Sequence, residues 1–456
     1  MPLESINPYT GATLEQMEPT TPAGVEHALV AAEQAAASWA ASAAPERAGL
    51  LGSIAGLLRE RRSELARVIT LEMGKLVGEA EAEIDKCALV CDFYAAHAFD
   101  DGFLADESVA SDAGKSLIVH QPLGPILAVM PWNFPFWQLF RCAAPAVAAG
   151  NPVLLKHASN VPRCALTIAG LWRDAGAPAG LFQTLLIGAK GAEQVVADPR
   201  VRAVSLTGSE RAGRRVAAIA GEHLKKSVLE LGGSDAFVVL EDADLEETVS
   251  VAIKSRFMNA GQSCIAAKRF ILAESIADAF IERFQDAAEA LLPGDPLDPD
   301  TTLAPLARRD IRDTLHEQVQ QSLAGGARLI TGGRALDRDG WFYAPTILDR
   351  VDPGMPAYDE ELFGPVAAVI RAAGEEDALR IANDSRFGLG GSVWTTDKAR
   401  GEAFARRMAC GSAFVNGQVK SDPRLPFGGI KSSGYGRELS ALGIREFVNS
   451  KTLWIA

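Results

Sequence analysis

Hydrophobic and polar residues form two different patterns along the chain, one typical of helices and one typical of strands. Over residues 21–98 the composition is rich in alanine, and apolar residues such as Leu50, Ile54 and Leu57 recur at a period near 3.6. This spacing predicts amphipathic helices. After a polar stretch at residues 106–114, the run at 116–121 has the character of a strand, and its place between two larger units predicts a bridging hairpin.

Short apolar runs then alternate with helical stretches in two successive series. The first series predicts strands at 126–130, 153–156, 182–187, 201–206 and 227–231. The second predicts strands at 236–240, 269–272, 366–370 and 411–416. Continuously apolar strands separated by helices are typical of parallel sheets covered on both faces. We therefore expect an α/β fold with two parallel-sheet units, the first of a dinucleotide-binding type.

Composition narrows the class of function. The 456 residues carry a net charge of −13 from 58 acidic and 45 basic residues, without a basic run that would attract nucleic acid. No apolar run approaches the roughly 18 residues that span a bilayer, and residues 1–7 lack a signal pattern, so we expect a cytoplasmic protein without a membrane partner. The six cysteines form no Cys-x-x-Cys pair, which argues against a disulfide framework and against a metal site.

Two side chains carry the strongest chemical signal. Cys264 ends the run Gly261-Gln262-Ser263-Cys264, and Glu230 precedes it by 34 residues (264 − 230) in Leu229-Glu230-Leu231-Gly232-Gly233. A thiol can attack a carbonyl, and a carboxylate can activate the water that releases the acyl group. We expect Cys264 at the start of a helix, where the dipole would favour the thiolate. A lone cysteine is otherwise more often a buried structural residue.

Two turns add polar groups suited to such chemistry. Asn133 lies in the stiff Pro131-Trp132-Asn133-Phe134-Pro135 loop after a strand, and its amide can donate to a developing oxyanion, although an isolated Asn often serves only as a turn former. The segment Thr207-Gly208-Ser209 leads from a strand into a helix, which suits a pyrophosphate. A standard Gly-x-Gly-x-x-Gly fingerprint is absent.

These segments together resemble the NAD(P)-dependent aldehyde dehydrogenase superfamily over essentially the whole chain. The matching motifs are Pro131–Pro135, Lys156, Thr207–Ser209, Glu230–Gly233, Gly261–Cys264, Glu361–Pro365, Pro426–Gly429 and Lys431–Gly434. The resemblance implies a cofactor-binding domain (1–104 and 122–230), a catalytic domain (231–443), and bridging or oligomerisation elements (105–121 and 444–456). It also implies a homodimer or homotetramer.

The resemblance assigns roles to individual residues. Cys264 would attack the aldehyde, Asn133 would hold the oxyanion, and Glu230 would activate water to hydrolyse the thioester. The implied cofactor contacts are Pro131, Trp132, Lys156, Ser159, Thr207, Gly208, Ser209, Leu231, Gly232, Glu361 and Phe363. No metal site is implied.

The cofactor is expected to be NADP or NAD. Ser159 stands where family members that prefer NAD often carry a Glu that grips the adenosine ribose. Ser159 beside the cationic Lys156 would leave room for a 2′-phosphate, so we predict that NADP is accepted. An alternative interpretation makes Ser159 the N-cap of the following helix.

The substrate is expected to be a small aldehyde with a distal carboxylate, as in the bacterial succinate-semialdehyde dehydrogenases that the chain resembles. Arg141 would bind that carboxylate, or would instead pair with an acidic residue of the protein. Trp137, Phe427 and Ser421 are further expected substrate contacts. A second Arg found in mammalian relatives is replaced here by Met258. A broad-specificity aldehyde dehydrogenase is the main alternative, and a non-catalytic protein on the same fold is a remote one.

Overall fold

The computed structural model describes residues 3–99 and 102–456, so residues 1–2 and 100–101 of the predicted cofactor-binding segment 1–104 lie outside it. The chain begins with an antiparallel hairpin that the hydrophobic pattern did not predict, β1 (Leu3–Ile6) and β2 (Thr13–Met17). Four helices follow, as the 3.6-residue period predicts: α1 (Pro22–Ala40), α2 (Ala44–Glu60), α3 (Arg62–Met73) and α4 (Val77–His97).

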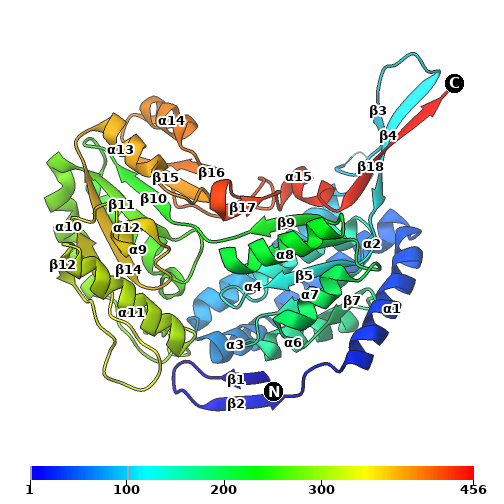
Figure 1. Cartoon of the computed structure of the whole chain (residues 1–456), viewed down its shortest axis with the longest axis horizontal. Helices are drawn as coiled ribbons and strands as arrows, with labels where there is room; N and C mark the ends of the chain where they lie inside the picture. Colours follow the sequence, from blue (N-terminus) through cyan, green and yellow to red (C-terminus); the bar gives the residue numbers. More distant parts are fainter. Residues whose placement is uncertain (1–2, 100–101) are drawn as a thin grey trace.

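A six-stranded sheet forms the centre of the lobe drawn in blue to green in Figure 1. Its order is β17-β9-β8-β5-β6-β7, and all neighbours are parallel except β17 with β9. The strands are β5 (Ile126–Met130), β6 (Val153–His157), β7 (Phe182–Thr184), β8 (Ala203–Thr207), β9 (Lys226–Glu230) and β17 (Gly434–Tyr435). The helices between them are α5 (Trp137–Ala148), α6 (Pro162–Asp174), α7 (Ala189–Ala197) and α8 (Glu210–Glu222).

This strand order creates a topological switch point. From β5 the chain moves outward through β6 to β7 and then returns to β8 on the other side of β5. Helices leave the two neighbouring strands toward opposite faces at such a point, which opens a crevice at the carboxyl ends of the strands. Met130, Thr207 and Glu230 are the last residues of β5, β8 and β9 and share this edge of the sheet.

A seven-stranded sheet forms the second lobe, in the order β12-β13-β14-β11-β10-β15-β16. Only the edge strand β12 is antiparallel to its neighbour. The strands are β10 (Asp235–Val239), β11 (Ala267–Ala273), β12 (Arg328–Thr331), β13 (Thr346–Asp349), β14 (Val366–Ala372), β15 (Gly390–Trp394) and β16 (Ser412–Val415). The helical segments are α9 (Leu245–Phe257), η1 (Met258–Gly261), α10 (Glu274–Glu289), α11 (Arg309–Ala324), α12 (Pro356–Asp359), α13 (Glu375–Asn383) and α14 (Lys398–Arg407).

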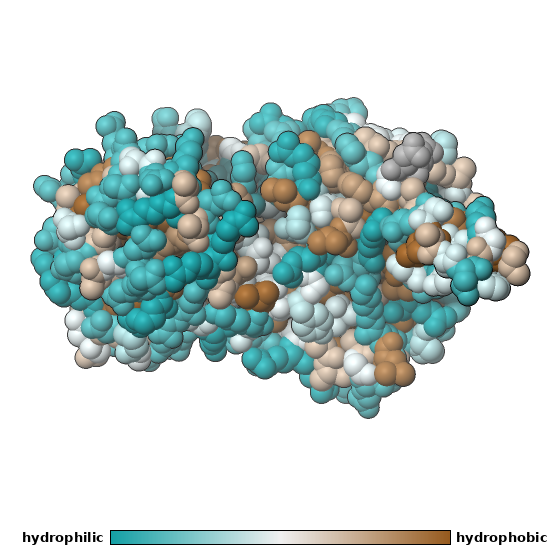
Figure 2. All heavy atoms as spheres, turned by 90° about the horizontal axis from the view of Figure 1, so that it is seen from above, coloured by the Kyte–Doolittle hydropathy of each residue, from teal (hydrophilic) through white to brown (hydrophobic). Residues whose placement is uncertain are grey.

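A third, three-stranded sheet projects from the body of the molecule (Figure 1). It contains β3 (Glu107–Ser108), β4 (Lys115–Pro122) and the C-terminal β18 (Val448–Ile455), which follows η2 (Lys431–Ser433), β17 and α15 (Ser440–Arg445). β18 pairs along its whole length with β4 of the same chain. Figure 2 shows hydrophobic side chains among hydrophilic ones on this projecting part, and Trp454 and Ile455 are 57% and 49% exposed.

The sequence pattern located β5 to β9 and β10, β11, β14 and β16 to within a few residues, but it missed β12, β13, β15 and β17. The expected α/β class with two largely parallel sheets is confirmed. One strand does not pair within the domain to which the sequence analysis assigned it. β17, inside the segment 231–443 assigned to the catalytic domain, hydrogen-bonds to β9 of the six-stranded sheet. The chain therefore returns to the first lobe before it reaches the projecting sheet.

Candidate active site

A cavity of about 200 Å³ lies at the carboxyl ends of β5, β8 and β9, and we call it the strand-end cavity. It is lined by Pro131, Trp132, Asn133, Gln138, Thr207, Gly208, Ser209, Glu230, Leu231, Gly232, Cys264, Glu361 and Phe363. Nine of the eleven residues expected to contact the cofactor are among them. Lys156 and Ser159 do not line this cavity. They lie at the end of β6 and just after it, beside β5 in the sheet.

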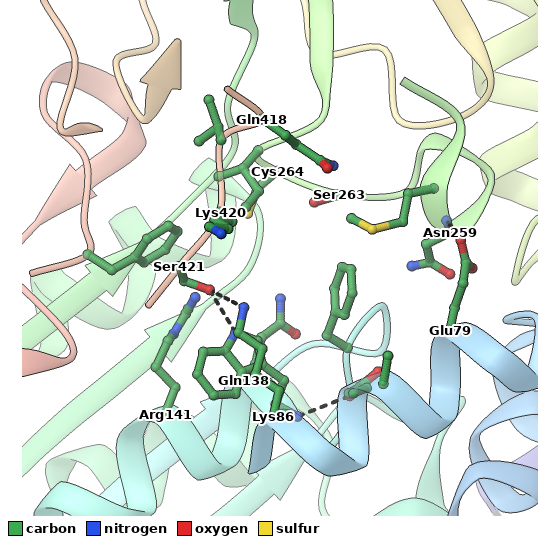
Figure 3. Close-up of a pocket in the computed structure, with 18 of the residues that line it drawn as sticks. Glu79, Lys86, Gln138, Arg141, Asn259, Ser263, Cys264, Gln418, Lys420 and Ser421 are labelled. Carbon is green, nitrogen blue, oxygen red and sulfur yellow. Dashed lines mark hydrogen bonds between the residues drawn. The ribbon is translucent and has the colours of Figure 1, made fainter. Parts of the chain in front are cut away.

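A second cavity, of about 250 Å³, lies between α4, α5 and the loops that follow η1 and β16, and we call it the α4–α5 cavity. Among its lining residues are all four predicted substrate contacts, Trp137, Arg141, Ser421 and Phe427 (Figure 3). Cys264 and Gln138 line both cavities. The thiol therefore stands where the two spaces meet.

The loop that carries the thiol has an unusual backbone. Asn259, Ala260 and Gly261 all adopt positive φ angles of 52°, 50° and 74°. Left-handed conformations of non-glycine residues cost about 1–2 kcal/mol each, so the surrounding contacts must hold this loop in place. A Cβ on Gly261 would lie 2.3 Å from both the Arg256 guanidinium and the Gly364 carbonyl, so only glycine fits there.

The expectation that Cys264 starts a helix is wrong. The residue lies in a turn between η1 and β11, so it is not the first residue of a helix. Burial raises the pKa of the Cys264 thiol to about 12, and the Lys268 ammonium opposes this shift. At neutral pH the free enzyme therefore holds a thiol, and activation requires a base or a nearby positive charge.

Hydrogen bonds connect the predicted oxyanion donor to this loop. The Asn133 Nδ2 donates to the Gln262 carbonyl at 2.9 Å, and the Asn259 Nδ2 donates to the Asn133 carbonyl at 2.9 Å. The Gln262 side chain in turn accepts from the Ala307 amide at 2.9 Å. Asn133 is 3% exposed and its second amide hydrogen remains available to an oxygen beside Cys264.

Two buried cations that the sequence reasoning missed hold the loop. Arg256 donates to the carbonyls of Ala267, Gly261 and Gly364, and burial lowers its pKa to about 9. The Lys268 Nζ donates to the Ser263 and Cys264 carbonyls at 2.7 and 2.9 Å. Arg256 is the penultimate residue of the mixed-polarity helix α9 and Lys268 is the second residue of β11, so nothing in the local pattern distinguishes them from surface residues.

Lys268 also reaches the predicted ribose contact. Its Nζ lies 3.2 Å from Glu361 Oε1, which accepts from the Gly233 amide at 3.1 Å. Beside it, the rings of Trp132 and Phe363 meet edge to face with centroids 5.7 Å apart. The contacts of Lys268 and Gly233 with Glu361, and of Trp132 with Phe363, therefore hold the Glu361–Phe363 loop at the strand-end cavity.

Glu230 is buried beside the thiol with neither carboxylate oxygen hydrogen-bonded within the described part of the chain. Burial, reinforced by the neighbouring Glu438 carboxylate, raises its pKa well above the usual value. A carboxylate with free lone pairs and a raised pKa is a stronger base than an ordinary one and is suited to accept a proton from water.

Arg141 shows both of the interactions that the sequence left open. Its guanidinium lines the α4–α5 cavity and lies over the Phe427 ring, 4.6 Å from the centroid. It is also paired with the buried Glu438 and donates to Thr207 Oγ1 at 3.3 Å. The charge of Arg141 is therefore already balanced by a carboxylate of the protein.

The residues around β6 correct one further expectation. Ser159 is exposed and does not cap α6, whose N-cap is Val161, so the N-cap interpretation is wrong. His157 was not expected to matter, yet its Nε2 lies 2.9 Å from the Pro135 carbonyl, and burial lowers its pKa to about 4. This neutral imidazole holds the Asn133 loop against the sheet.

Ser209 caps α8, with its hydroxyl accepting from the Ala212 amide at 3.4 Å. A Cβ on Gly208 would meet only Leu206 at 3.7 Å, so the space above this turn is open. A helix N-terminus with open space beside it fits a phosphate group. Among the described residues, no cluster of three or more His, Cys, Asp or Glu side chains is arranged to hold a metal ion, and no helix is both long and apolar enough to span a membrane.

With this geometry in view, comparison with known proteins identifies the class. Residues 1–453 match the model of the aldehyde dehydrogenase family, and this chain belongs to that family. A probable NADP(+) succinate-semialdehyde dehydrogenase of Synechocystis sp. is 51% identical over 456 residues, covering 100% of both chains. The NADP(+) succinate-semialdehyde dehydrogenase 1 of Mycobacterium bovis is 49% identical over 459 residues, again covering 100% of both.

Solved structures agree with this assignment. The crystal structure of succinic semialdehyde dehydrogenase from Streptococcus pyogenes in complex with NADP+ superposes with a TM-score of 0.97 at 42% identity, covering 99% of each chain. A structure described as showing cofactor and substrate selection by Gox0499 has a TM-score of 0.98 at 43% identity and covers 100% of both chains. The chain is therefore similar over essentially its full length to several proteins named as NADP(+) succinate-semialdehyde dehydrogenases.

Proposed function

We propose that this protein oxidises succinate semialdehyde to succinate with NADP+ as the hydride acceptor. The single observation that carries the proposal is that Cys264 borders two cavities at once. The strand-end cavity is lined by the N-terminus of α8, by the Glu361 carboxylate expected to bind a ribose, and by aromatic rings. The α4–α5 cavity is lined by cationic and apolar side chains. The close relatives named above act on this aldehyde with NADP(+).

The residues perform the reaction in two stages. The Cys264 thiol releases its proton to solvent as Sγ adds to the aldehyde carbon, and the oxyanion of the resulting thiohemiacetal accepts hydrogen bonds from Asn133 Nδ2 and the Cys264 backbone amide. The residues of the strand-end cavity would hold NADP+, which would supply the hydride acceptor for this intermediate. Glu230 then takes a proton from water, which attacks the thioester carbon and releases the carboxylic acid and the thiol.

The cofactor contacts follow from the strand ends. Thr207, Gly208 and Ser209 offer amides and a hydroxyl to the pyrophosphate, and Glu361 offers its carboxylate to the nicotinamide ribose. Lys156 and Ser159 lie at the neighbouring strand end, where a cation and a small hydroxyl accommodate a 2′-phosphate. We assign residues 1–104 and 122–230 to cofactor binding and residues 231–443 to catalysis, with 105–121 and 444–456 as bridging elements.

We also propose an oligomeric state and a cellular compartment for the protein. The projecting β3–β4–β18 sheet exposes Trp454 and Ile455 and leaves one edge of β18 unpaired within the described chain, which favours a homodimer or homotetramer joined there. All six cysteines are described and carry free thiols, which suits the reducing cytoplasm.

An aldehyde panel with both cofactors tests the function. Purified protein is expected to form NADPH with succinate semialdehyde at a kcat/KM at least about tenfold above that for butanal, hexanal or benzaldehyde. Equal kcat/KM values across the panel would instead establish a broad-specificity aldehyde dehydrogenase. A strong preference for NAD+ would refute the argument from Ser159. Added coenzyme A is expected to leave turnover unchanged, because Glu230 already provides the hydrolytic base.

A further inference from the structure

The Cys264 thiol is influenced by two positive and two negative side chains. Burial is the largest influence and raises the pKa of the thiol to about 12. Among the charged neighbours, Lys268 and then Arg141 lower that pKa, whereas Glu361 and Asp235 raise it. Because Cys264 is not the first residue of a helix, these two cations are the side chains that can favour the thiolate.

The two cations differ in how far a carboxylate of the protein already balances them. Arg141 pairs with Glu438, and both side chains are buried, so they form a closed pair. Lys268 is equally buried, but the one carboxylate that pairs with it in the described part of the chain is Glu361, at 3.2 Å. The Glu361 side chain is 21% exposed and also accepts from the Gly233 amide. Water screens this carboxylate more than it screens the ammonium, so Lys268 keeps more of its field.

The Lys268 ammonium is fixed beside the nucleophile. Its Nζ donates to the carbonyls of Ser263 and Cys264 at 2.7 and 2.9 Å, and the Glu361 carboxylate provides a third acceptor. An ammonium has three hydrogens, so each of them has a partner. The positive charge therefore stays against the loop that carries the thiol and away from bulk water, where electrostatic effects are strong.

The carbonyl contacts alone do not explain a lysine at this position. All 7 residues of β11 are buried, and a charge inside such a strand is costly even when it is paired and hydrogen-bonded. A neutral glutamine amide could donate to a carbonyl without the cost of burying a charge. What lysine adds is a positive charge, and the adjacent group whose ionisation the reaction needs is the Cys264 thiol.

We propose that Lys268 is the positioning residue that makes Cys264 reactive: its ammonium stabilises the thiolate while its hydrogen bonds hold the loop. The thiol proton goes to solvent in this ionisation. Glu361 opposes the effect, because its carboxylate lies next to the same ammonium. The inference rests on the proposed function, in which Cys264 is the nucleophile.

Alkylation of Cys264 in the enzyme without added cofactor tests the inference in the absence of any aldehyde. The thiolate displaces iodide from iodoacetamide, an uncharged reagent, and mass spectrometry of the Cys264 peptide gives the rate. Lys268→Met removes the charge and the hydrogen bonds, Lys268→Gln removes the charge but keeps a donor, and Lys268→Arg keeps the charge. At pH 7 to 9, Lys268→Met and Lys268→Gln are expected to slow the reaction about tenfold or more, and Lys268→Arg by less than about threefold.

Cys410 is the internal control in every sample. Like Cys264 it is only partly buried, whereas the other four cysteines are buried. Burial and then Asp235 raise the pKa of the Cys410 thiol, and Lys431 opposes this shift, so its charged neighbours do not include Lys268. Its alkylation rate is expected to stay within about threefold of the wild-type value in each variant. A general loosening of the structure would instead speed the reaction of both cysteines.

The glutamine variant separates charge from hydrogen bonding. A wild-type rate at Cys264 in Lys268→Gln would overturn the role of the charge, because a neutral donor would then suffice. A wild-type rate in Lys268→Met would overturn the inference altogether.

Glu361→Gln gives a measurement that does not depend on the folding of a Lys268 variant. It removes the opposing charge from a partly exposed side chain and should speed alkylation of Cys264 about threefold or more, whereas an unchanged or slower rate would contradict the inference. The proposed function is tested separately in the wild type. If the enzyme alkylated at Cys264 still oxidised succinate semialdehyde, the proposed nucleophile would be wrong, whatever effect Lys268 has on the alkylation rate.

Discussion

One buried carboxylate connects the helical start of the chain to the active site. The Glu83 side chain on α4 is 1% exposed, pairs with the fully buried Lys75, and accepts from the Phe136 and Trp137 amides at 2.8 and 3.0 Å. Lys75 Nζ lies 3.7 Å from the centroid of the Phe134 ring. Glu83 therefore anchors the beginning of α5, the helix that presents side chains to both cavities.

The structure allows the effect of Glu83→Leu to be estimated. Removing the carboxylate leaves the Lys75 ammonium buried without its partner, which destabilises a protein by about 3–5 kcal/mol. For a folding unit of 150–250 residues, each kcal/mol lowers the melting temperature by about 2–4 °C, so the expected decrease is about 6–20 °C. Adding Lys75→Met removes the unpaired charge as well. The double variant should regain most of that loss, although the two α5 amides stay unpartnered.

Apparent melting temperatures at one scan rate, measured for both single variants and the double variant, complete a double-mutant cycle. Asp85→Asn is the control on the same helix, because the Asp85 side chain is 52% exposed and its ion pair with Arg62 contributes less than about 1 kcal/mol. Additive losses in the double variant would refute the coupling of the two charges. A Glu83→Leu protein that melts within 2 °C of the wild type, roughly the effect of 1 kcal/mol, would refute the burial argument itself.

The remaining predictions concern the reacting groups. Cys264→Ala should abolish aldehyde oxidation while NADP+ still binds in a fluorescence titration, and residual turnover above background would exclude Cys264 as the nucleophile. Glu230→Gln should leave one burst of NADPH per site followed by turnover slowed about 10²–10⁴-fold, and a variant with normal steady-state turnover would remove Glu230 from deacylation. Because only the ionised carboxylate accepts a proton and burial raises its pKa, kcat should increase as pH rises through that pKa, and a kcat that already stops rising in the ordinary carboxyl range would argue against this base. Asn133→Ala should lower kcat/KM about 10²–10³-fold without loss of cofactor affinity, and a decrease under tenfold would mean that the backbone amide alone holds the oxyanion. Ser159→Glu should shift the ratio of kcat/KM for NADP+ and NAD+ toward NAD+ by about tenfold or more through repulsion of the 2′-phosphate, whereas an unchanged ratio would place that phosphate elsewhere.

Local patterns of apolar and polar residues located most strands of the two large sheets. Apolar strands such as Ile126–Met130, whose observed bounds equal the predicted ones, show their burial directly in the run of residues. The turn at Thr207–Ser209 was also recognised, because a strand, a small residue and an N-cap follow one another without interruption. The hairpin Leu3–Met17 was missed, since its strands alternate too weakly to stand out.

The prediction that a helix begins at Cys264 was wrong for a different reason. Small and polar residues precede many helices, but here a run of three left-handed residues turns the chain into β11 instead. That conformation is stabilised by Arg256, which donates to the nearby Gly261 and Ala267 carbonyls and also to the carbonyl of Gly364, far away in the sequence. No local pattern reports such contacts.

The amino-acid sequence by itself predicted the α/β class, the strands that end at the site, and Cys264, Glu230 and Asn133 as candidate reacting groups, because each depends on residue chemistry, on short-range periodicity or on motifs shared with a known family. Only the tertiary structure decided that the thiol joins two cavities and that Glu438 already balances Arg141. Charge pairing and burial depend on which distant segments meet, and those distances are set by the packing of the two sheets and their helices.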